Sequence, residues 1–459
     1  MSYYPFRIEP QEVPLVDTDY RTIKTSIPAP GTKQLLARLG TVESRSMHGQ
    51  LPIVWDQAED FSIYDHCGNR WIDFTSTIFV ANVGHSNPRV LNAIRESLDA
   101  KLISCYAYAS TIRAKYLEKL LQFSGGENQK AFLLSAGTEA TEAVLKLMRL
   151  YGARHVKPRK GVICIENNWH GRTLGAQMMS SNTAQKDWIG FQDDNIFYIS
   201  FPYPWEEPCT DWGSYLRDSL RGLEEKGISL EHDICGFLLE TFQGWGAVFY
   251  PPEYVQAVKD ICDEFDILLS FDEMQSGFGR TGRNFGYEHY DVSPDLIACG
   301  KGMGGGFPIS GVIGRADIMD LPEVGNMSST HSANPLACAA GLAVLQELEH
   351  RALVSEAERK GEIMRKELES LQAVFDQYIS WVLGKGLIYA ILFKDPLTGN
   401  PDPSMASMVA ERCMHKGLLV VHTGRESVKI GPPLSIPDDA ILEGVSVIKE
   451  ALLELVFHD

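Results

Sequence analysis

Two residues that could act together follow two short, mainly apolar segments in the middle of the chain. Asp272 closes the run Ile267–Phe271, and Lys301 follows Leu296–Cys299 after a single glycine. Apolar runs of this length are typical of parallel strands that are buried on both faces. Because open α/β sheets bind ligands beyond the carboxyl ends of their strands, we expect the acid and the amine at one edge. There a desolvated lysine can form a Schiff base, and an aspartate can keep a pyridine nitrogen protonated.

Each of these residues also has an ordinary explanation when it is taken alone. An aspartate at a strand end more often caps a helix, and a lone lysine is more often a solvated surface residue. The longer sequence around each residue decides between the ordinary explanation and the chemical one. DEMQSGFGRTG, which begins at Asp272, resembles the DE-x-Q-x-G-x-G-R-x-G motif of the class III, fold-type I pyridoxal-phosphate aminotransferases. GKGMGGGFP around Lys301 resembles the K-G-x-GGG-x-P motif of the same family, and the spacing between the two motifs also fits.

The resemblance implies an α/β fold of fold type I. Its central sheet is mostly parallel and covered by helices on both faces, and a smaller α+β domain is built from the N- and C-terminal segments. The alternation of predicted strands and helices as far as Leu321 agrees with such a sheet. We expect an N-terminal arm and part of the small domain in residues 1–109, the large cofactor-binding domain in 110–335, and the C-terminal small domain in 336–459.

The segments outside the large domain are less strongly patterned. Residues 1–49 are punctuated by proline and predict an arm, which either crosses onto a partner subunit or is a flexible terminus. Ile53–Trp55, Phe61–Tyr64 and Trp71–Phe74 predict the strands of a small antiparallel sheet. Trp188–Ile228, rich in proline, tryptophan and acids, predicts a peripheral excursion.

The composition excludes several classes of function. The chain has 459 residues, a formal net charge of −18 and a pI near 5.2, which argues against binding nucleic acid or an anionic membrane. It contains no 18-residue apolar run, and its first residues, MSYYPFRIEP, lack the pattern of a signal peptide. The nine cysteines form no CxxC pair, and no histidine cluster has the spacing of a metal site. We therefore expect a cytoplasmic protein without a metal.

The expected cofactor is pyridoxal 5'-phosphate. The resemblance implies that Lys301 carries it and acts as the base, and that Asp272 holds its ring nitrogen. Gly137 and Thr138 begin a predicted helix, whose free N–H groups suit a phosphate. A threonine of the partner subunit, Thr330, is expected to reach the same phosphate, which implies a homodimer or a dimer of dimers with shared sites. The full set of predicted cofactor-binding residues is Gly137, Thr138, Trp169, Glu240, Asp272, Gln275, Lys301 and Thr330.

The predicted substrate pocket departs from the family at two coupled positions. In many relatives an arginine before a P-P-L run binds the substrate α-carboxylate and pairs with the glutamate of a Q-G-E motif. Here KIGPPL has Lys429 at the arginine position, and QGWG has Trp245 at the glutamate position. Arg425 is close enough in sequence to replace the arginine, and the sequence leaves its direction open. Arg172 of WHGRT either grips a remote anion of the substrate or forms a surface salt bridge. The predicted substrate-binding residues are Phe79, Tyr106, Arg172, Trp245 and Lys429.

Three functions remain to be weighed. The first is an aminotransferase that moves an amino group from an amine or ω-amino acid with an anionic far end to a keto acid. The second is a lyase on the same cofactor, which eliminates a β leaving group from a phosphorylated or phosphonate amine and releases ammonia. The third, a non-catalytic relative, is disfavoured because Lys301, Asp272 and Gln275 are all present.

Overall fold

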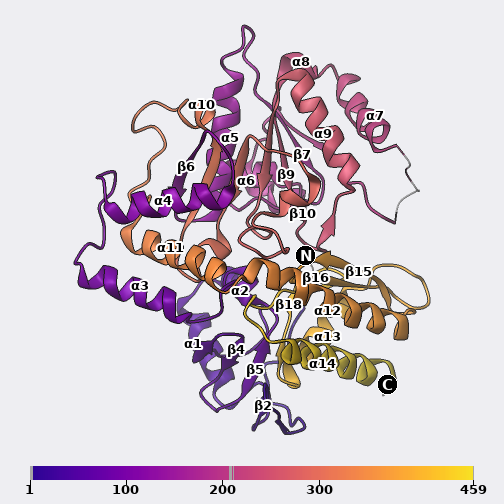
Figure 1. The fold of residues 1–459 in the computed structure, drawn as a ribbon. Coiled ribbons are helices and arrows are strands. Elements are labelled where there is room, and N and C mark those ends of the chain that lie inside the picture. The colour runs from indigo at the N-terminus through magenta and orange to yellow at the C-terminus, as the bar shows by residue number, and fades with distance from the viewer. Residues whose placement is uncertain (1–3, 206–208, 210, 458–459) are drawn as a thin grey trace.

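The centre of the molecule is a seven-stranded sheet (Figure 1), seen in a computed structural model that describes residues 4–205, 209 and 211–457. The strand order is β6-β14-β13-β12-β9-β7-β8. Neighbouring strands run parallel from β13 to β8, whereas β14 is antiparallel to both β13 and β6. The strands are β6 (Gln129–Leu134), β7 (Gly161–Ile165), β8 (Ile196–Ile199), β9 (Ile234–Glu240), β12 (Leu268–Asp272), β13 (Leu296–Cys299) and β14 (Ser310–Arg315).

Helices bury both faces of this sheet. Alternate residues of a strand point to opposite faces, and on β12 Leu268 packs into the cluster that contains Val144 of α5 (Gly137–Gly152). The next residue, Leu269, packs into the cluster that contains Val258 of α9 (Pro252–Phe265). The two helices therefore cover opposite faces, which confirms the doubly covered, mostly parallel sheet predicted from the apolar runs.

Two smaller sheets accompany the large one, and the first of them contains strands from both ends of the chain. In the first, N-terminal strands in the order β1-β2-β5-β4-β3 are extended by β17, which pairs with β5 in parallel. The second is the antiparallel sheet β15-β16-β19-β18. In Figure 1 the indigo N-terminal strands and the yellow C-terminal helices lie together below the large sheet. The strands are β1 (Val16–Asp17), β2 (Thr22–Ile23), β3 (Gln57–Glu59), β4 (Ser62–Tyr64), β5 (Arg70–Asp73), β15 (Ile379–Lys385), β16 (Ile388–Phe393), β17 (Leu418–Leu419), β18 (Val421–His422) and β19 (Ser427–Ile430).

Three of the longer helices begin with the same local device, a capping Asn or Asp followed by proline. The Asn87 side chain accepts from the Arg89 N–H at 3.0 Å at the start of α3, and equivalent caps begin α11 and α13. Proline fits the first helical position because its missing N–H has no helical partner there. The remaining helices and the short hairpin beside the site are α1 (Thr32–Val42), α2 (Ser76–Phe79), α3 (Pro88–Asp99), α4 (Thr111–Ser124), α6 (Leu174–Met179), α7 (Trp212–Glu224), α8 (Leu230–Asp233), α10 (Ala316–Met319), α11 (Pro335–His350), α12 (Leu353–Val374), α13 (Pro403–His415), α14 (Asp438–Phe457), β10 (Phe242–Gln243) and β11 (Val248–Phe249).

Two predictions outside the large sheet were wrong, one wholly and one in part. Ile53–Trp55 is not a strand; the strand is β3, whose Gln57 pairs with Tyr64 across a tight turn at Asp60, where φ is 49°. The segment 188–228 is not wholly peripheral, because β8 is an edge strand of the large sheet and α7 packs on α9. β3 reads QAE, so hydrophobic patterning gives little signal there, whereas β8 reads IFYI, an apolar run that the sequence reasoning passed over.

The described part of the N-terminal arm packs on its own chain. The Arg7 N–H donates to Glu411 Oε1 of α13 at 3.1 Å, and Arg21 Nε forms an ion pair with Glu443 of α14 at 2.6 Å. Whether the arm also reaches a partner stays a prediction, as do the domain boundaries at 109 and 335. Across residues 4–205, 209 and 211–457, the structure contains neither a helix suited to cross a membrane nor a group of three metal-binding side chains.

Candidate active site

A cavity of about 280 Å3 lies at the carboxyl edge of the large sheet. Its position follows from strand register, because Asp272 at the end of β12 pairs with Glu240 at the end of β9 and with Ala298 of β13. Lys301 follows β13 by two residues and faces the same space. The acid and the amine that the sequence placed at one edge are thus brought together. The lining residues are Gly137, Thr138, Trp169, His170, Gly171, Arg172, Glu240, Thr241, Phe242, Asp272, Met274, Gln275, Ser276 and Lys301.

Asp272 is held by a histidine that our sequence reasoning missed. His170 Nδ1 lies 2.8 Å from Asp272 Oδ2, and both side chains are buried. The Met274 N–H donates to the other carboxylate oxygen at 3.0 Å. His170 follows Trp169 in the WHG string, so the signal was present but its partner, about a hundred positions later, could not be read from the sequence. The pair fixes the orientation of the Asp272 carboxylate in the cavity.

Lys301 is desolvated, as an amine nucleophile requires. Burial lowers the pKa of Lys301, and the nearby charges of Asp272 and Glu240 oppose that shift. The turn around it is tightly packed: a Cβ added to Gly302 would lie 2.5 Å from Asn82 Nδ2. Lys301 itself has φ 44°, in the left-handed region. The backbone is therefore shaped to hold this side chain at the edge of the sheet.

Glu240, at the end of the neighbouring strand β9, sits beside Asp272. Its Oε2 accepts from the N–H groups of Trp169 and Gly244 at 3.3 and 3.4 Å. Burial, followed by repulsion from Asp272, raises the pKa of Glu240 to about 8. Two adjacent carboxylates cannot both ionise easily in a dry site, and Asp272 has the histidine partner. Glu240 therefore supports the polar network without adding a full second negative charge.

The start of α5 forms one wall of the cavity. Gly137 is the first residue of the helix, so its N–H and that of Thr138 have no helical acceptor, whereas the Glu139 N–H donates to the Ala136 carbonyl. Thr138 Oγ1 lies 2.6 Å from Thr173 Oγ1, and a Cβ added to Gly171 would lie 2.3 Å from Thr138 Oγ1. The backbone of the 171–173 loop thus approaches the helix start closely. This arrangement suits an anion such as a phosphate.

The lining of the cavity also includes an aromatic ring and a cation. Trp169 lines the cavity, and the Arg172 guanidinium carbon lies 4.5 Å from the centre of its ring. Within the described part of the chain, Arg172 forms no ion pair, so the predicted alternative of a surface salt bridge is not seen. A cation is therefore available at the cavity wall.

Two of the predicted substrate-binding residues do not line the cavity but adjoin it. Lys429 is buried, and its amine donates to Gln275 Oε1 at 2.8 Å and to the Gly244 carbonyl at 2.5 Å. Phe79 is buried beneath that amine, which lies 4.7 Å from the centre of its ring. Of these residues only Gln275 lines the cavity. Lys429 thus reaches the site through Gln275.

Three further predicted residues lie outside the cavity of this single chain. Trp245 stacks under Arg425, whose guanidinium carbon lies 3.7 Å from the centre of the Trp245 ring. This contact settles the direction of Arg425, which lies on Trp245 and beside Glu426 rather than in the cavity. Tyr106 is exposed, with its hydroxyl 3.0 Å from Ser328 Oγ, and Thr330 is also exposed. The roles predicted for these residues stay predictions.

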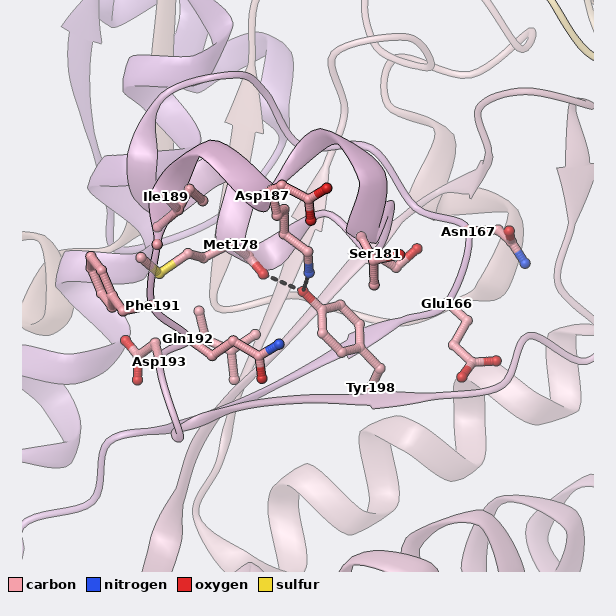
Figure 2. Close-up of a pocket in the computed structure, with 14 residues that line it drawn as sticks. Glu166, Asn167, Met178, Ser181, Asp187, Ile189, Phe191, Gln192, Asp193 and Tyr198 are labelled. Carbon is pink, nitrogen blue, oxygen red and sulfur yellow. Dashed lines mark hydrogen bonds between the residues drawn. The ribbon is translucent and has the colours of Figure 1, made fainter. Parts of the chain in front are cut away.

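A second, larger cavity of about 740 Å3 lies beside β8 (Figure 2). Lys186 Nζ donates to Tyr198 Oη at 3.0 Å, and that hydroxyl donates to the Met178 carbonyl. Asp193, on its rim, is paired with Arg149 at 2.7 Å. The charges of this cavity are therefore largely engaged, and its lining includes neither the acid nor the amine of the smaller cavity.

Comparisons with known proteins decide the family. A family model described as aminotransferase class-III matches residues 44–452. The chain belongs to the class III aminotransferases. It is 32% identical over 412 residues to acetylornithine aminotransferase from Caldanaerobacter subterraneus subsp. tengcongensis, an alignment that covers 89% of this chain and 97% of that protein. It is also 32% identical over 434 residues to 5-aminovalerate aminotransferase from Pseudomonas aeruginosa, covering 92% of this chain and 99% of the relative.

A solved structure of ornithine aminotransferase from Toxoplasma gondii agrees in fold, with a TM-score of 0.80 at 26% identity over 92% of this chain and 94% of that one. Pyridoxal phosphate partly occupies the active site of that protein. Aminotransferases of class III depend on pyridoxal phosphate, which is the cofactor of this enzyme. The cavity fits it, because a buried acid, a desolvated amine, an aromatic wall and a helix start all face one space.

Proposed function

We propose that Lys301 and Asp272 perform the chemistry of this aminotransferase. When bound, pyridoxal phosphate supplies a ring that withdraws electrons from the carbon bearing the amine. Lys301 Nζ would hold the cofactor and, once free, would take the proton from that carbon. Asp272, oriented by His170 at 2.8 Å, keeps the ring nitrogen protonated. Thr138 and the start of α5 hold the phosphate, and Gln275 holds the ring oxygen.

The donor that this site suits best is an amine or ω-amino acid with an anionic far end. One observation carries this proposal: Lys429, at the position where relatives use an arginine for the α-carboxylate, is turned onto Gln275 and Gly244. Arg172 is the cation that lines the cavity instead. Relatives named for 5-aminovalerate and 4-aminobutyrate, whose amines are remote from the carboxylate, support this class of donor.

The acceptor that we propose is a keto acid, which supplies the carbonyl carbon that transfer of an amino group requires. The elimination of a β leaving group uses the same acid and amine, so the site geometry alone does not separate the two reactions. The relatives reported above are aminotransferases, which supports transfer. A transferase without keto acid stops after one turnover with its cofactor in the amino form, whereas a lyase would keep releasing ammonia.

The test of the donor class is a comparison of half-reactions. The cofactor-loaded enzyme is mixed with glutamate, β-alanine, 4-aminobutyrate or 2-aminoethylphosphonate, and the absorbance of the bound cofactor is followed. Losing a bidentate ion pair in a dry site reduces kcat/KM by roughly 30- to 1000-fold, so glutamate should be slower than the best of the other three. Glutamate as the fastest of the four would contradict the proposal.

We also propose that the enzyme works in the cytoplasm as a homodimer, or a dimer of dimers, with shared sites. Thr330 is exposed in the single chain and lies outside the cavity, which fits a residue that completes the site of a partner subunit. The nine cysteines are all free thiols in this structure, which suits a reducing compartment.

A further inference from the structure

The Lys429 side chain spans the gap between the C-terminal sheet and the large sheet. Lys429 lies on β19, where it pairs with Ala390 of β16 and with Val421 of β18. Its amine crosses to the β10–β11 hairpin and donates to the Gly244 carbonyl, and to Gln275 beyond the end of β12. Only 5% of the Lys429 surface is exposed, so its amine makes these contacts out of reach of bulk solvent.

This contact selects one orientation of the Gln275 amide. A side-chain amide has one end that accepts hydrogen bonds and one that donates them, whereas an ammonium group only donates. While the Lys429 amine is protonated, the amide oxygen faces it, at 2.8 Å, because the reverse orientation would place two donors against each other. The amide nitrogen is left as the donor that Gln275 can offer to a bound molecule, and Gln275 lines the cavity.

The surroundings of the amide permit little rearrangement. A Cβ added to Gly244 would lie 2.3 Å from Gln275 Nε2 and 2.6 Å from Glu240 Oε1. Burial and then the charge of Lys301 lower the pKa of Lys429 to about 7, while Glu240 opposes the shift. An amine that carries only part of a charge at neutral pH is a weak partner for a carboxylate, but it remains a hydrogen-bond donor.

We propose that Lys429 is a positioning residue for the cofactor rather than a substrate-binding residue: it holds the Gln275 amide with its nitrogen directed to the cofactor ring oxygen. This inference rests on the proposed function, in which Gln275 holds that oxygen.

A double-mutant cycle on cofactor affinity tests this coupling. The dissociation constant of pyridoxal phosphate is measured by equilibrium dialysis for the wild type, Lys429→Met, Gln275→Leu and the double variant. Because a hydrogen bond to a charged group is lost in each case, we expect each single variant to bind the cofactor about tenfold more weakly. The double variant should bind no more weakly than Gln275→Leu, within about twofold. Lys429→Arg, which keeps the donors, should restore most of the affinity.

A matched control is Lys360→Met. Lys360 on α12 is another buried lysine, with 6% of its surface exposed. Its amine donates to the Leu434 backbone carbonyl at 2.9 Å. Its loss should lower Tm without changing cofactor affinity beyond about twofold, since no hydrogen bond to the cofactor depends on it. If Lys429→Met fails to fold, Lys429→Gln takes its place in the double-mutant cycle with Gln275→Leu.

Two results would overturn the inference. If Lys429→Met weakens binding equally in the wild-type and Gln275→Leu backgrounds, or leaves it unchanged in the wild type, Lys429 does not act through Gln275. A wild type that binds no pyridoxal phosphate would contradict the proposed function itself, and this inference with it. Additive losses in a wild type that binds the cofactor contradict only the role of Lys429.

Discussion

At the scale of single residues, the site depends on buried polar groups that hold one another in place. His170 and the Met274 N–H hold the two carboxylate oxygens of Asp272. The sequence predicted Asp272 and Lys301 because each ends an apolar run, and family motifs surround both. It could not predict the contact of Lys429 with Gln275, because that contact joins residues 154 positions apart in sequence.

The Asp272→Asn variant tests the role of this carboxylate. The amide is nearly the same size, so the fold and cofactor occupancy should be retained, but it cannot hold the ring nitrogen protonated. We expect proton removal from the donor to slow by roughly 100- to 10,000-fold, measured in a single-turnover half-reaction. Near wild-type turnover in Asp272→Asn would show that another group protonates the ring.

Glu240 should make the stability of the cofactor-free protein depend on pH. Its pKa is raised to about 8 in the folded state from a normal value of 4.5, so the folded protein binds this proton more tightly than the unfolded chain does. The stability contributed is present below pH 4.5 and is lost as pH rises toward 8, with a slope on the order of 1 kcal/mol per pH unit. Urea unfolding of the wild type and Glu240→Gln between pH 5 and 7 measures the difference. Equal slopes in the two proteins would contradict the prediction.

At the scale of elements, the strands that carry the site were the best predicted. The runs at 267–271 and 296–299 match β12 and β13 to within one residue, because strands buried on both faces are continuously apolar. Short polar strands such as β3, which reads QAE, owe their conformation to their partners in the sheet. Their positions follow from tertiary pairing, which the local pattern does not contain.

The close approach of the 171–173 loop to α5 gives a prediction at this scale. Gly171 has φ 142°, and a Cβ there would lie 2.3 Å from Thr138 Oγ1, so Gly171→Ala should displace the helix start that faces the phosphate. We expect cofactor affinity to fall at least about tenfold, measured by dialysis, because an unfavourable backbone angle and a steric clash add together. Gly222→Ala on α7 is the control: a Cβ there meets nothing within 4 Å, and affinity should be unchanged. Unchanged affinity in Gly171→Ala would argue against a phosphate at this helix start.

At the scale of the whole molecule, the two ends of the chain complete one small domain beside the large sheet. β17 pairs with β5. Lys429 of β19, in the C-terminal part of the chain, contacts Gln275 of the cavity lining. The family resemblance predicted this arrangement, whereas the hydrophobic pattern of the terminal segments did not, since the pairing joins residues far apart in sequence.

A site shared between subunits, as proposed above, would make activity depend on assembly. Thr330 is exposed in the single chain, so we expect Thr330→Ala to weaken cofactor binding about tenfold through the loss of a hydrogen bond to a charged group of the cofactor in the partner's site. Sedimentation at catalytic dilution should show a dimer or a larger assembly wherever activity is retained. A fully active monomer would contradict the shared site.

The central claim, that this cavity is the active site and Lys301 its reactive amine, is tested most directly by chemical labelling. Borohydride reduction of the cofactor-loaded enzyme fixes pyridoxal phosphate to the amine that carries it, and peptide mapping identifies the residue. We predict the label on Lys301, and we predict that Lys301→Ala loses the label together with turnover by several orders of magnitude. Label on any other lysine, including the neighbouring buried amine of Lys429, would contradict the account.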